Sequence, residues 1–353
     1  MFQSLHGGLP AARRTIPSRL AGLVVTTART VPVTVEMDGD ELDAEDAWRL
    51  ARTFGLGRIV VGSFVRFRYG DGFTSSRALA LQTSLAVVPF LLALTGLAAH
   101  LDEERPAKVV AQTIQTVSPG SGASDALARA VQGPGSSERA GELALSLGLV
   151  LALASMTTAM GQVERGANRI YGIRRDRQAP AKYGRAAVLT AVLAAPVGIG
   201  LLLLVAGGAF ADAMADTYGW SASLVLGFRL GRWPVGTALL VFAVAVLFDH
   251  SPRRRQPALS WLALGAGISV LLTLLAAGGL ASYVHVSSSF GSTYGPLAGI
   301  VALLVWSLLS AMALFYGLAV CAQLEALRAG QPEPAYDDPG RPHGQRTDED
   351  PRG

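Results

Sequence analysis

The chain has 353 residues, of which 50% are hydrophobic and 16% charged, with a formal net charge of +4. Soluble domains carry about 25% charged residues, disordered chains are poor in apolar residues, and a single cysteine cannot form a disulfide within the chain. The composition therefore excludes a disordered chain and a disulfide scaffold, and the mean hydropathy of +0.38 indicates a protein whose solvent is partly lipid.

The first part of the chain is predicted to be a mostly disordered cytoplasmic segment, residues 1–53. Its short apolar stretch at 20–25 is not long enough for a signal peptide. Seven acidic residues between 36 and 46 are interpreted as a solvated stretch, because the glutamate that closes a calcium loop is missing. From 54 to 68, apolar and basic residues recur on a helical period, which predicts an amphipathic helix lying in the membrane interface.

Long uncharged runs predict the membrane domain, residues 54–328, as an all-α bundle of six transmembrane helices. A helix needs about 20 residues to cross roughly 30 Å of hydrocarbon, and backbone groups in lipid must find partners within the segment. The fourth run is short and is extended past Arg232, whose long side chain can snorkel to the headgroups. The predicted spans are 78–100, 143–161, 186–210, 231–248, 259–281 and 297–320.

The connections between these spans predict the orientation of the chain. Segments that alternate along the chain, including both ends, carry 24 of the 30 Lys and Arg residues, and the other connections carry six. Basic residues favour the cytoplasmic side, so both termini are predicted to be cytoplasmic. The connection 101–142 is predicted to form a small helical cap on the outer face, and 329–353 a disordered cytoplasmic tail.

Two prolines near the centres of predicted spans are candidates for a transport path or hinge. Pro89 and Pro196 each remove one helical hydrogen bond, and paired breaks at the bilayer centre are typical of transporters. Gln82 and Thr83 are polar neighbours that could satisfy the freed carbonyls. The alternative is a simple packing kink, which membrane helices tolerate. Gly295 and Gly299 form a GxxxG pattern, which predicts close helix packing.

Residues that would carry chemistry are hard to find, so the sequence predicts neither an enzyme nor a cofactor or metal. The five histidines are far apart and have no carboxylates at metal-ligand spacing. Phosphate-binding loops and nucleophile elbows are absent. The basic loops are interpreted as topology signals facing anionic headgroups, not as a nucleic-acid surface.

Three motifs resemble the YihY/BrkB family of bacterial inner-membrane proteins, formerly labelled the ribonuclease BN family. The motifs are ANRIYGIR at 167–174, SPRRRQPALSWLALGAG at 251–267, and a stretch beginning STYGPLAG at 292. The first span also resembles the family's helix, with Pro89 at its proline. The residues that carry the resemblance are Asn168, Tyr171, Pro252, Tyr294, Gly295, Trp306 and Gly317.

The resemblance implies an inner-membrane protein of the bacterial envelope. Family members are linked to envelope integrity, serum resistance and lipid export, so a transporter or lipid-handling protein is one hypothesis. The alternative is a non-transporting membrane scaffold or interaction protein. This chain has Ala319 where the family has an intramembrane glutamate, and Cys321 where it has an asparagine. Expected partners are membrane lipids with anionic headgroups and a second copy of the chain.

Overall fold

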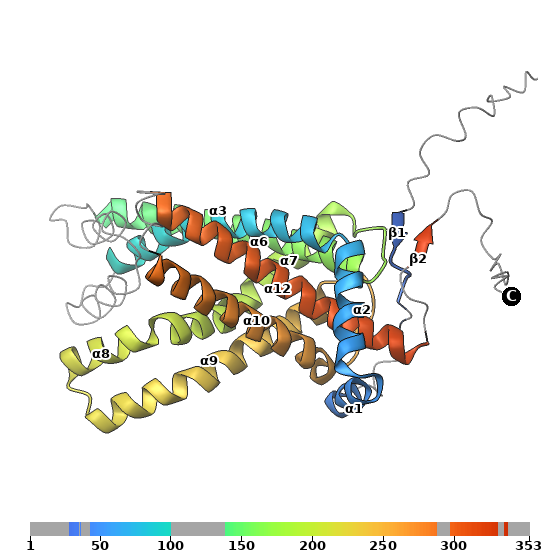
Figure 1. Cartoon of the computed structure of the whole chain (residues 1–353). Helices are drawn as coiled ribbons and strands as arrows, with labels where there is room; N and C mark the ends of the chain where they lie inside the picture. The colour runs from blue at the N-terminus through green and yellow to red at the C-terminus, as the bar shows by residue number, and fades with distance from the viewer. Residues whose placement is uncertain are drawn as a thin grey trace, which may run out of the picture.

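The computed structural model describes residues 28–34, 36, 43–99, 138–287, 297–330 and 335–337, and within them it is almost entirely helical (Figure 1). The elements, in chain order, are β1 Ala28–Thr30, α1 Ala44–Phe54, α2 Leu56–Tyr69, α3 Gly72–Ala99, α6 Glu138–Ile170, α7 Ala179–Leu201, η1 Leu202–Ala206, α8 Gly207–Tyr218, α9 Ala222–His250, α10 Leu259–Val286, α12 Ala298–Arg328 and β2 Ala335–Asp337.

Long helices cover all six predicted spans. Among the described residues, five helical stretches are long and apolar enough to cross a membrane: 145–170, 179–218, 222–250, 259–286 and 298–328. The first predicted span lies in α3, which is 28 residues long but does not belong to this set. The uncertain fourth span belongs to the 29-residue helix α9, which begins nine residues before the predicted start.

The ends of the chain contain more regular structure than predicted. The helix α1 falls within the segment expected to be mostly disordered, and Asp43 caps it by accepting hydrogen bonds from the amides of Glu45 and Asp46. The strand β2 lies in the tail expected to be disordered and pairs antiparallel with β1, Ala28 opposite Asp337. The sequence did not predict these two elements, because short polar segments give no long hydrophobic period to detect.

The predicted amphipathic segment forms the helix α2, which runs across the end of the bundle (Figure 1). The turn between α2 and α3 passes through Asp71, which has a φ of 56° that aspartate tolerates. The basic residues of α2 differ in their surroundings. Arg58 and Arg68 are exposed, whereas Arg66 is buried on the side that packs against α12.

The helix α12 forms the centre of the molecule. It packs against α10, α3, α2 and α6, and every residue from 317 to 326 is buried. Gly317 allows α12 to approach α10, because a Cβ atom there would collide with the carbonyl oxygen of Gly265. Such small residues let membrane helices pack closely without leaving a void.

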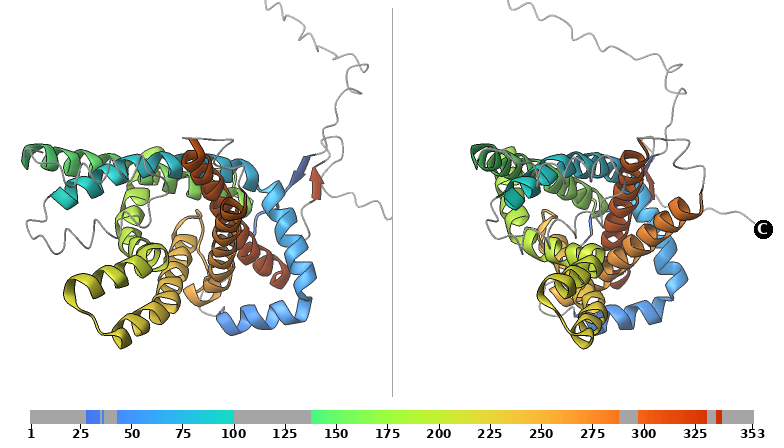
Figure 2. Two further views of the ribbon diagram at one scale, coloured as in Figure 1. Left: turned by 60° about the vertical axis from the view of Figure 1, so that its left-hand side comes forward. Right: turned by 90° about the vertical axis from the view of Figure 1, so that its left-hand side faces the viewer.

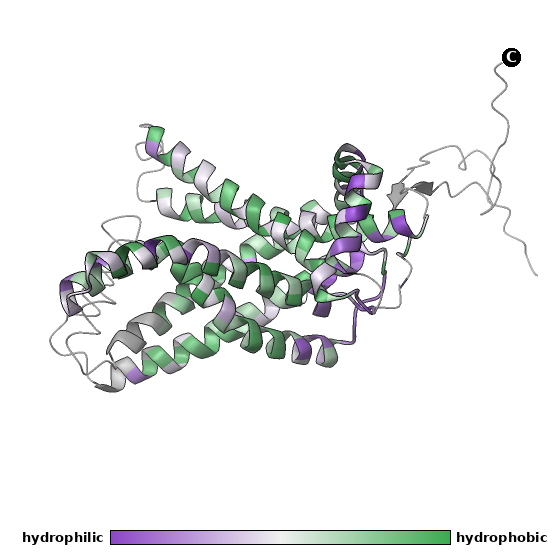
Figure 3. Cartoon of the chain, turned by 90° about the horizontal axis from the view of Figure 1, so that it is seen from below, coloured by the Kyte–Doolittle hydropathy of each residue, from purple (hydrophilic) through white to green (hydrophobic). Residues whose placement is uncertain are grey.

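The two ends of the bundle differ in character. The hydrophilic residues concentrate at the end where α1, α2 and the loops before α7 and α10 meet, as the hydropathy colouring shows (Figure 3). The α8–α9 hairpin stands apart from the α3–α6 pair (Figure 2). Gly200 of α7 and Gly236 of α9 approach closely where these two helices cross. The predicted helical cap at 101–142 lies largely outside the described residues, and α6 begins within its last part, at Glu138.

Candidate functional site

The polar end of the bundle holds a buried group of side chains that we call the Glu325 cluster. It joins residues from α2, the end of α6, the loop before α10, and α12. Because these elements are far apart in the sequence, only the folded chain brings the side chains together. The members of the cluster are Arg66, Tyr171, Arg254, Gln323 and Glu325.

Glu325 connects two partners within this cluster. Its carboxylate accepts a hydrogen bond from the hydroxyl of Tyr171 at 3.0 Å and one from Nη2 of Arg254 at 2.7 Å. The guanidinium of Arg254 also lies over the ring of Tyr171, 4.5 Å from its centre, which adds a cation–π attraction. A charge-assisted hydrogen bond of this length is strong, so the pair fixes the loop before α10 against α12.

Arg66 brings α2 into the same cluster. Its Nε donates to Oε1 of Gln323 at 3.2 Å, and its Nη1 donates to Oγ1 of Thr34 at 3.2 Å and to the carbonyl of Ile170 at 3.4 Å. The residue is only 1% exposed. Burial lowers the pKa of Arg66 to about 10, so its guanidinium is still charged at neutral pH. The cluster therefore holds two buried arginines against one carboxylate.

The surroundings of Tyr171 shift the pKa of its phenol. Burial, reinforced by the neighbouring Glu325 carboxylate, raises the pKa of Tyr171 well above its ordinary value of 10. The phenol thus remains protonated and acts as a hydrogen-bond donor. Gly172 follows it with a φ of 78° and allows the chain to turn out of α6, because glycine adopts this backbone conformation without steric cost.

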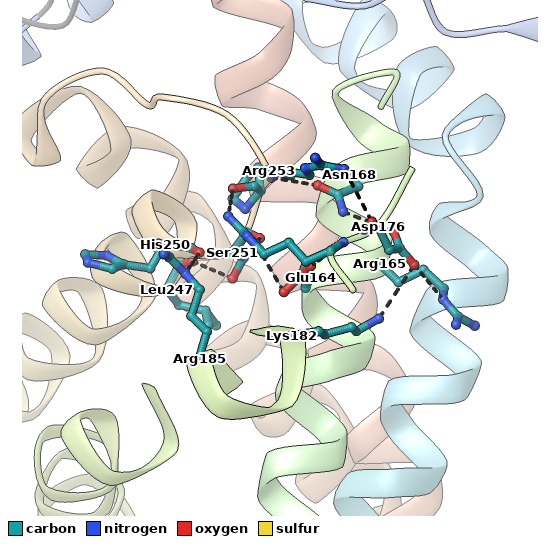
Figure 4. A network of polar contacts seen from close by, with 12 residues as sticks. Glu164, Arg165, Asn168, Asp176, Lys182, Arg185, Leu247, His250, Ser251 and Arg253 are labelled. Carbon is teal, nitrogen blue, oxygen red and sulfur yellow. Dashed lines mark hydrogen bonds and ion pairs between the residues drawn. The ribbon is translucent and has the colours of Figure 1, made fainter. Parts of the chain in front are cut away.

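A second group, the Asp176 network, lies next to the first and links α6, the start of α7 and the loop before α10 (Figure 4). The side chain of Asp176 accepts from Nδ2 of Asn168 at 3.1 Å and from Nε of Arg165 at 3.3 Å. It also pairs with Nζ of Lys182 at 3.6 Å. Asn168 in turn accepts from the backbone amide of Arg253 at 2.8 Å. Asn168 therefore bridges the two loops.

The charges of this network set the protonation of Asp176. Burial alone would raise the pKa of Asp176, but the hydrogen bond from Asn168 and the charges of Lys182 and Arg165 outweigh it. The net effect lowers the pKa of this carboxyl group below its ordinary value. Asp176 is therefore ionised at neutral pH and holds its cationic partners in place.

Arg177 completes the link between the loops. It pairs with the carboxylate of Glu164 at 3.1 Å and donates to the carbonyl oxygens of Ser251 and Pro252 at 3.0 and 2.8 Å. Buried carbonyl groups need such partners, so Arg177 satisfies the backbone at the start of the SPRRR motif. The first two residues of the motif thus help to fix the loop before α10 to the loop that carries Arg177.

The structure brings three of the predicted family-motif residues into one region. Asn168 and Tyr171 belong to the two groups described above, and the carbonyl of Pro252 accepts from Arg177. Gly317 lies where α12 meets α10, and Trp306 is half-buried on α12. The predicted motif residues Tyr294 and Gly295 lie outside the described residues.

The predicted transport-path residues are placed on separate helices. Pro89 on α3 and Pro196 on α7 are both half-buried. The helix α3 packs against α6 and α12, whereas α7 packs against α6 and α9. Gln82 donates to the hydroxyl of Thr158 and to the carbonyl of Ser155 on α6, so it bonds across helices.

The other predicted residues on these helices have simpler surroundings. Thr83 is half-buried on α3, one position after Gln82. Gly299, predicted to pack with Gly295, is exposed near the start of α12. The buried residue Ala319 occupies the position where the family has a glutamate, and Glu325 supplies a buried carboxylate six residues further along the same helix.

Sequence reasoning missed Glu325, Arg66 and Arg254 as members of one cluster. Arg254 was interpreted as a topology signal and Arg66 as part of an amphipathic helix, and each residue fits that interpretation when taken alone. A signal was nevertheless present. Glu325 and Gln323 interrupt an apolar helix, and Arg66 stands among apolar residues at helical spacing. Polar residues in such positions usually have specific partners.

Two cavities of the described residues bear on function. An open apolar groove of about 770 Å³, here called the apolar cavity, lies between α9 and α10. A second open hollow, of about 610 Å³ and lined mostly by charged side chains, lies beside the Asp176 network and is here called the polar cavity. The first is lined by Trp233, Pro234, Thr237, Ala238, Val241, Phe242, Ala245, Leu259, Ser260 and Ala263. In the described part of the chain, no group of three His, Cys, Asp or Glu side chains is placed to hold a metal ion.

Comparisons with known proteins agree with the motifs. Residues 63–339 match the family described as virulence factor BrkB. The ribonuclease-like protein YfkH of Bacillus subtilis is 25% identical over 261 residues, which cover 74% of this chain and 93% of that protein. A UPF0761 membrane protein of Chromohalobacter salexigens is 27% identical over 273 residues, 75% of this chain and 63% of that protein. No solved structure matches the chain.

Proposed function

This chain belongs to the BrkB family, and from that premise we propose that it is a lipid-handling protein of the bacterial inner membrane that maintains envelope integrity. The chain is a multi-pass membrane protein by family and by its five long apolar helices. We propose that α3 is a sixth span and that both termini are cytoplasmic. The pairing of β1 with β2 supports this topology, because it brings residues 28–30, before the first helix, together with residues 335–337, after the last.

The apolar cavity between α9 and α10 carries the proposal of lipid handling. Its lining extends along α9 from Trp233 to Ala245, which is about 18 Å at 1.5 Å per residue. This length suits much of an extended acyl chain. Its walls offer almost only carbon atoms, apart from the hydroxyls of Thr237 and Ser260. A cavity of this kind favours a lipid tail over a polar solute.

The helix α2 supports the placement of this end at a membrane surface. Its apolar side chains Leu56, Val60, Val61 and Phe64 are exposed, and the guanidinium groups of Arg58 and Arg68 stack near the rings of Phe54 and Tyr69. Apolar residues beside exposed basic residues suit the boundary between acyl chains and anionic headgroups.

The second candidate is a non-transporting scaffold that acts through its loops, including contacts with a second copy of the chain. One observation favours it. The Glu325 cluster and the Asp176 network hold the loops rigidly together, as a fixed docking platform would require. The nuclease wording in the name of YfkH describes that protein, and the function proposed for this chain includes no enzymatic activity, cofactor or nucleic-acid partner.

Leaflet-resolved lipid analysis of a deletion strain tests the proposal. We expect a changed distribution of phospholipid between the leaflets, restored by the wild-type gene but not by Ala245→Trp, which fills the apolar cavity. Leu226→Trp adds the same bulk at an exposed position of α9 outside the cavity and serves as the control. An unchanged lipid distribution in the deletion strain, with a weakened envelope, would favour the scaffold.

A further inference from the structure

The polar cavity beside the Asp176 network has the properties of a ligand site. It lies where the loop after α6, the start of α7 and the loop before α10 meet, and its volume of about 610 Å³ is typical of small-molecule sites. Its lining residues are Arg175, Asp176, Arg177, Gln178, Ala181 and Arg253. Three arginines against one aspartate give the lining a formal charge of +2.

Two of the three arginines have hydrogen-bonding capacity left for a ligand. Arg177 is bound to Glu164 and to two backbone carbonyls. Arg175, in contrast, is exposed and has no hydrogen bond or ion pair within the described part of the chain. The side chain of Arg253 makes one long hydrogen bond, 3.5 Å from its Nη1 to the carbonyl of Asp176. Both guanidinium groups can therefore turn toward an anion in the cavity.

The start of α7 contributes to the same cavity. Gln178 stands at the N-cap position and makes no side-chain hydrogen bond to the helix. In the first turn of α7, Pro180 has no N–H, so the amides of Ala179 and Ala181 are the ones left without partners in the helix, and the helix dipole favours negative charge there. The α7 terminus and the two arginines thus line the same pocket, and a phosphoryl group is the ligand that such a set of donors suits.

The surface of α7 below the cavity indicates that the phosphoryl group belongs to a lipid. Ala181 lines the cavity, and Val188, Val192 and Ile199 follow at intervals of 7, 11 and 18 residues. At 3.6 residues per turn, these positions fall on one face of the helix. The three apolar side chains are 63%, 58% and 51% exposed. An acyl chain can lie along this stripe while its headgroup occupies the cavity.

We propose that the cavity, here called the Arg175–Arg253 pocket, binds the phosphate of an anionic phospholipid whose acyl chain follows the exposed face of α7. The inference rests on the proposed function, because it requires this end of the bundle to lie at the inner surface of the membrane. It adds a specific site to a general attraction of basic loops for anionic lipid.

The test compares lipid binding by two matched double variants of the full-length protein. Delipidated protein in neutral detergent is titrated with phosphatidylglycerol, phosphatidylcholine and inorganic phosphate, and bound molecules are counted by native mass spectrometry. Arg175→Gln with Arg253→Gln removes the two guanidinium groups of the pocket that have hydrogen-bonding capacity left. Arg174→Gln with Arg255→Gln removes the same charge from exposed positions of the same loops that do not line it.

We expect the wild type and the control to retain one phosphatidylglycerol, bound more tightly than phosphatidylcholine. The pocket variant should lose at least about tenfold in this affinity, because it can no longer form charge-assisted hydrogen bonds from these two side chains to the phosphate. An equal loss in both double variants would overturn the proposal in favour of diffuse attraction. Inorganic phosphate binding as tightly as phosphatidylglycerol would overturn it in favour of a soluble ligand. A deletion strain with unchanged lipid leaflets would contradict the proposed function but leave this binding result standing.

Discussion

Glu325 pairs with the buried side chain of Arg254 and shares a cluster with the buried Arg66, so its removal would leave buried positive charge without a counter-charge. Arg254 pairs with it directly, and Arg66 lies in the same cluster with its guanidinium held by neutral oxygens. A buried ion pair stabilises a protein little more than well-packed apolar residues would. Removing one partner is costly, however, because it leaves the other charge buried and unpaired. The cluster therefore depends on the carboxylate of Glu325 more than on any single hydrogen bond.

We predict that Glu325→Ala destabilises the protein by about 3–5 kcal/mol, the usual cost of breaking a buried pair. Glu325→Gln should cost less, because the amide oxygen can still accept from Tyr171. Thermal unfolding in detergent, followed by tryptophan fluorescence, measures both. The control is Asp212→Asn, which breaks the exposed pair with Arg229 and should cost about 1 kcal/mol or less. Equal losses for Glu325→Ala and Asp212→Asn would contradict the role of burial.

Asp176 makes a second prediction possible, because its pKa is lowered in the folded protein. An unfolded aspartate has a pKa of about 3.9. As the pH falls, Asp176 is protonated first in the unfolded chain, because its pKa is higher there than in the folded protein. The ionised carboxylate therefore stabilises the folded state fully above about pH 5, and this stabilisation is lost as the pH falls through the lower pKa of the folded state. The difference in Tm between the wild type and Asp176→Asn should be constant from pH 7 to about 5 and shrink at more acidic pH. A Tm difference that grows as the pH falls would contradict the lowered pKa of Asp176.

At the scale of whole elements, α2 presents three faces, and sequence periodicity resolves only two of them. Ile59 and Arg66 face the protein, Val60 and Phe64 are exposed and apolar, and Arg58 is exposed and basic. The helical period of apolar and basic residues is the same whether an apolar residue faces the protein or the lipid. Only the packing against α12 shows that Ile59 belongs to the core and Phe64 to the surface.

The exposed apolar face of α2 should lie in the membrane interface. We predict that an environment-sensitive fluorophore attached to Phe64→Cys in the full-length protein, reconstituted in anionic vesicles, emits at shorter wavelength than the same fluorophore on Arg58→Cys and is quenched by lipid-borne nitroxide. The same label on Arg58→Cys is the control and should remain in a water-like environment. Equal quenching at the two positions would argue against an interfacial face. Cys321 is buried, so it should not compete for the label.

The elements that sequence could predict are those governed by one local property. Long uncharged runs located α6, α7, α9, α10 and α12, because a membrane span requires about 20 apolar residues wherever it occurs. The polar groups at the end of the bundle depend instead on distant partners. Tyr171 and Glu325 are 154 positions apart. No local pattern distinguishes Arg254, which pairs with a buried carboxylate, from its neighbours Arg253 and Arg255.

At the scale of the whole molecule, length and charge together indicate how the bundle crosses the membrane. The continuous helical stretch from Ala179 to Tyr218 has 40 residues, about 60 Å, or twice the thickness of the hydrocarbon. The exposed ion pair between Asp212 and Arg229 joins α8 to α9. We infer that the α8–α9 hairpin extends beyond the bilayer on the side opposite the Glu325 cluster.

This arrangement predicts which loops an impermeant thiol reagent reaches in intact cells. Ser221 lies in the exposed turn of the hairpin, and Arg255 in the exposed part of the loop before α10. In a Cys321→Ala background, Ser221→Cys should react from outside, and Arg255→Cys only after the inner membrane is permeabilised. Ser251 would be a poor choice for labelling because it is buried. Reaction of Arg255→Cys in intact cells, with Ser221→Cys protected, would invert the proposed topology and place the Arg175–Arg253 pocket in the outer leaflet.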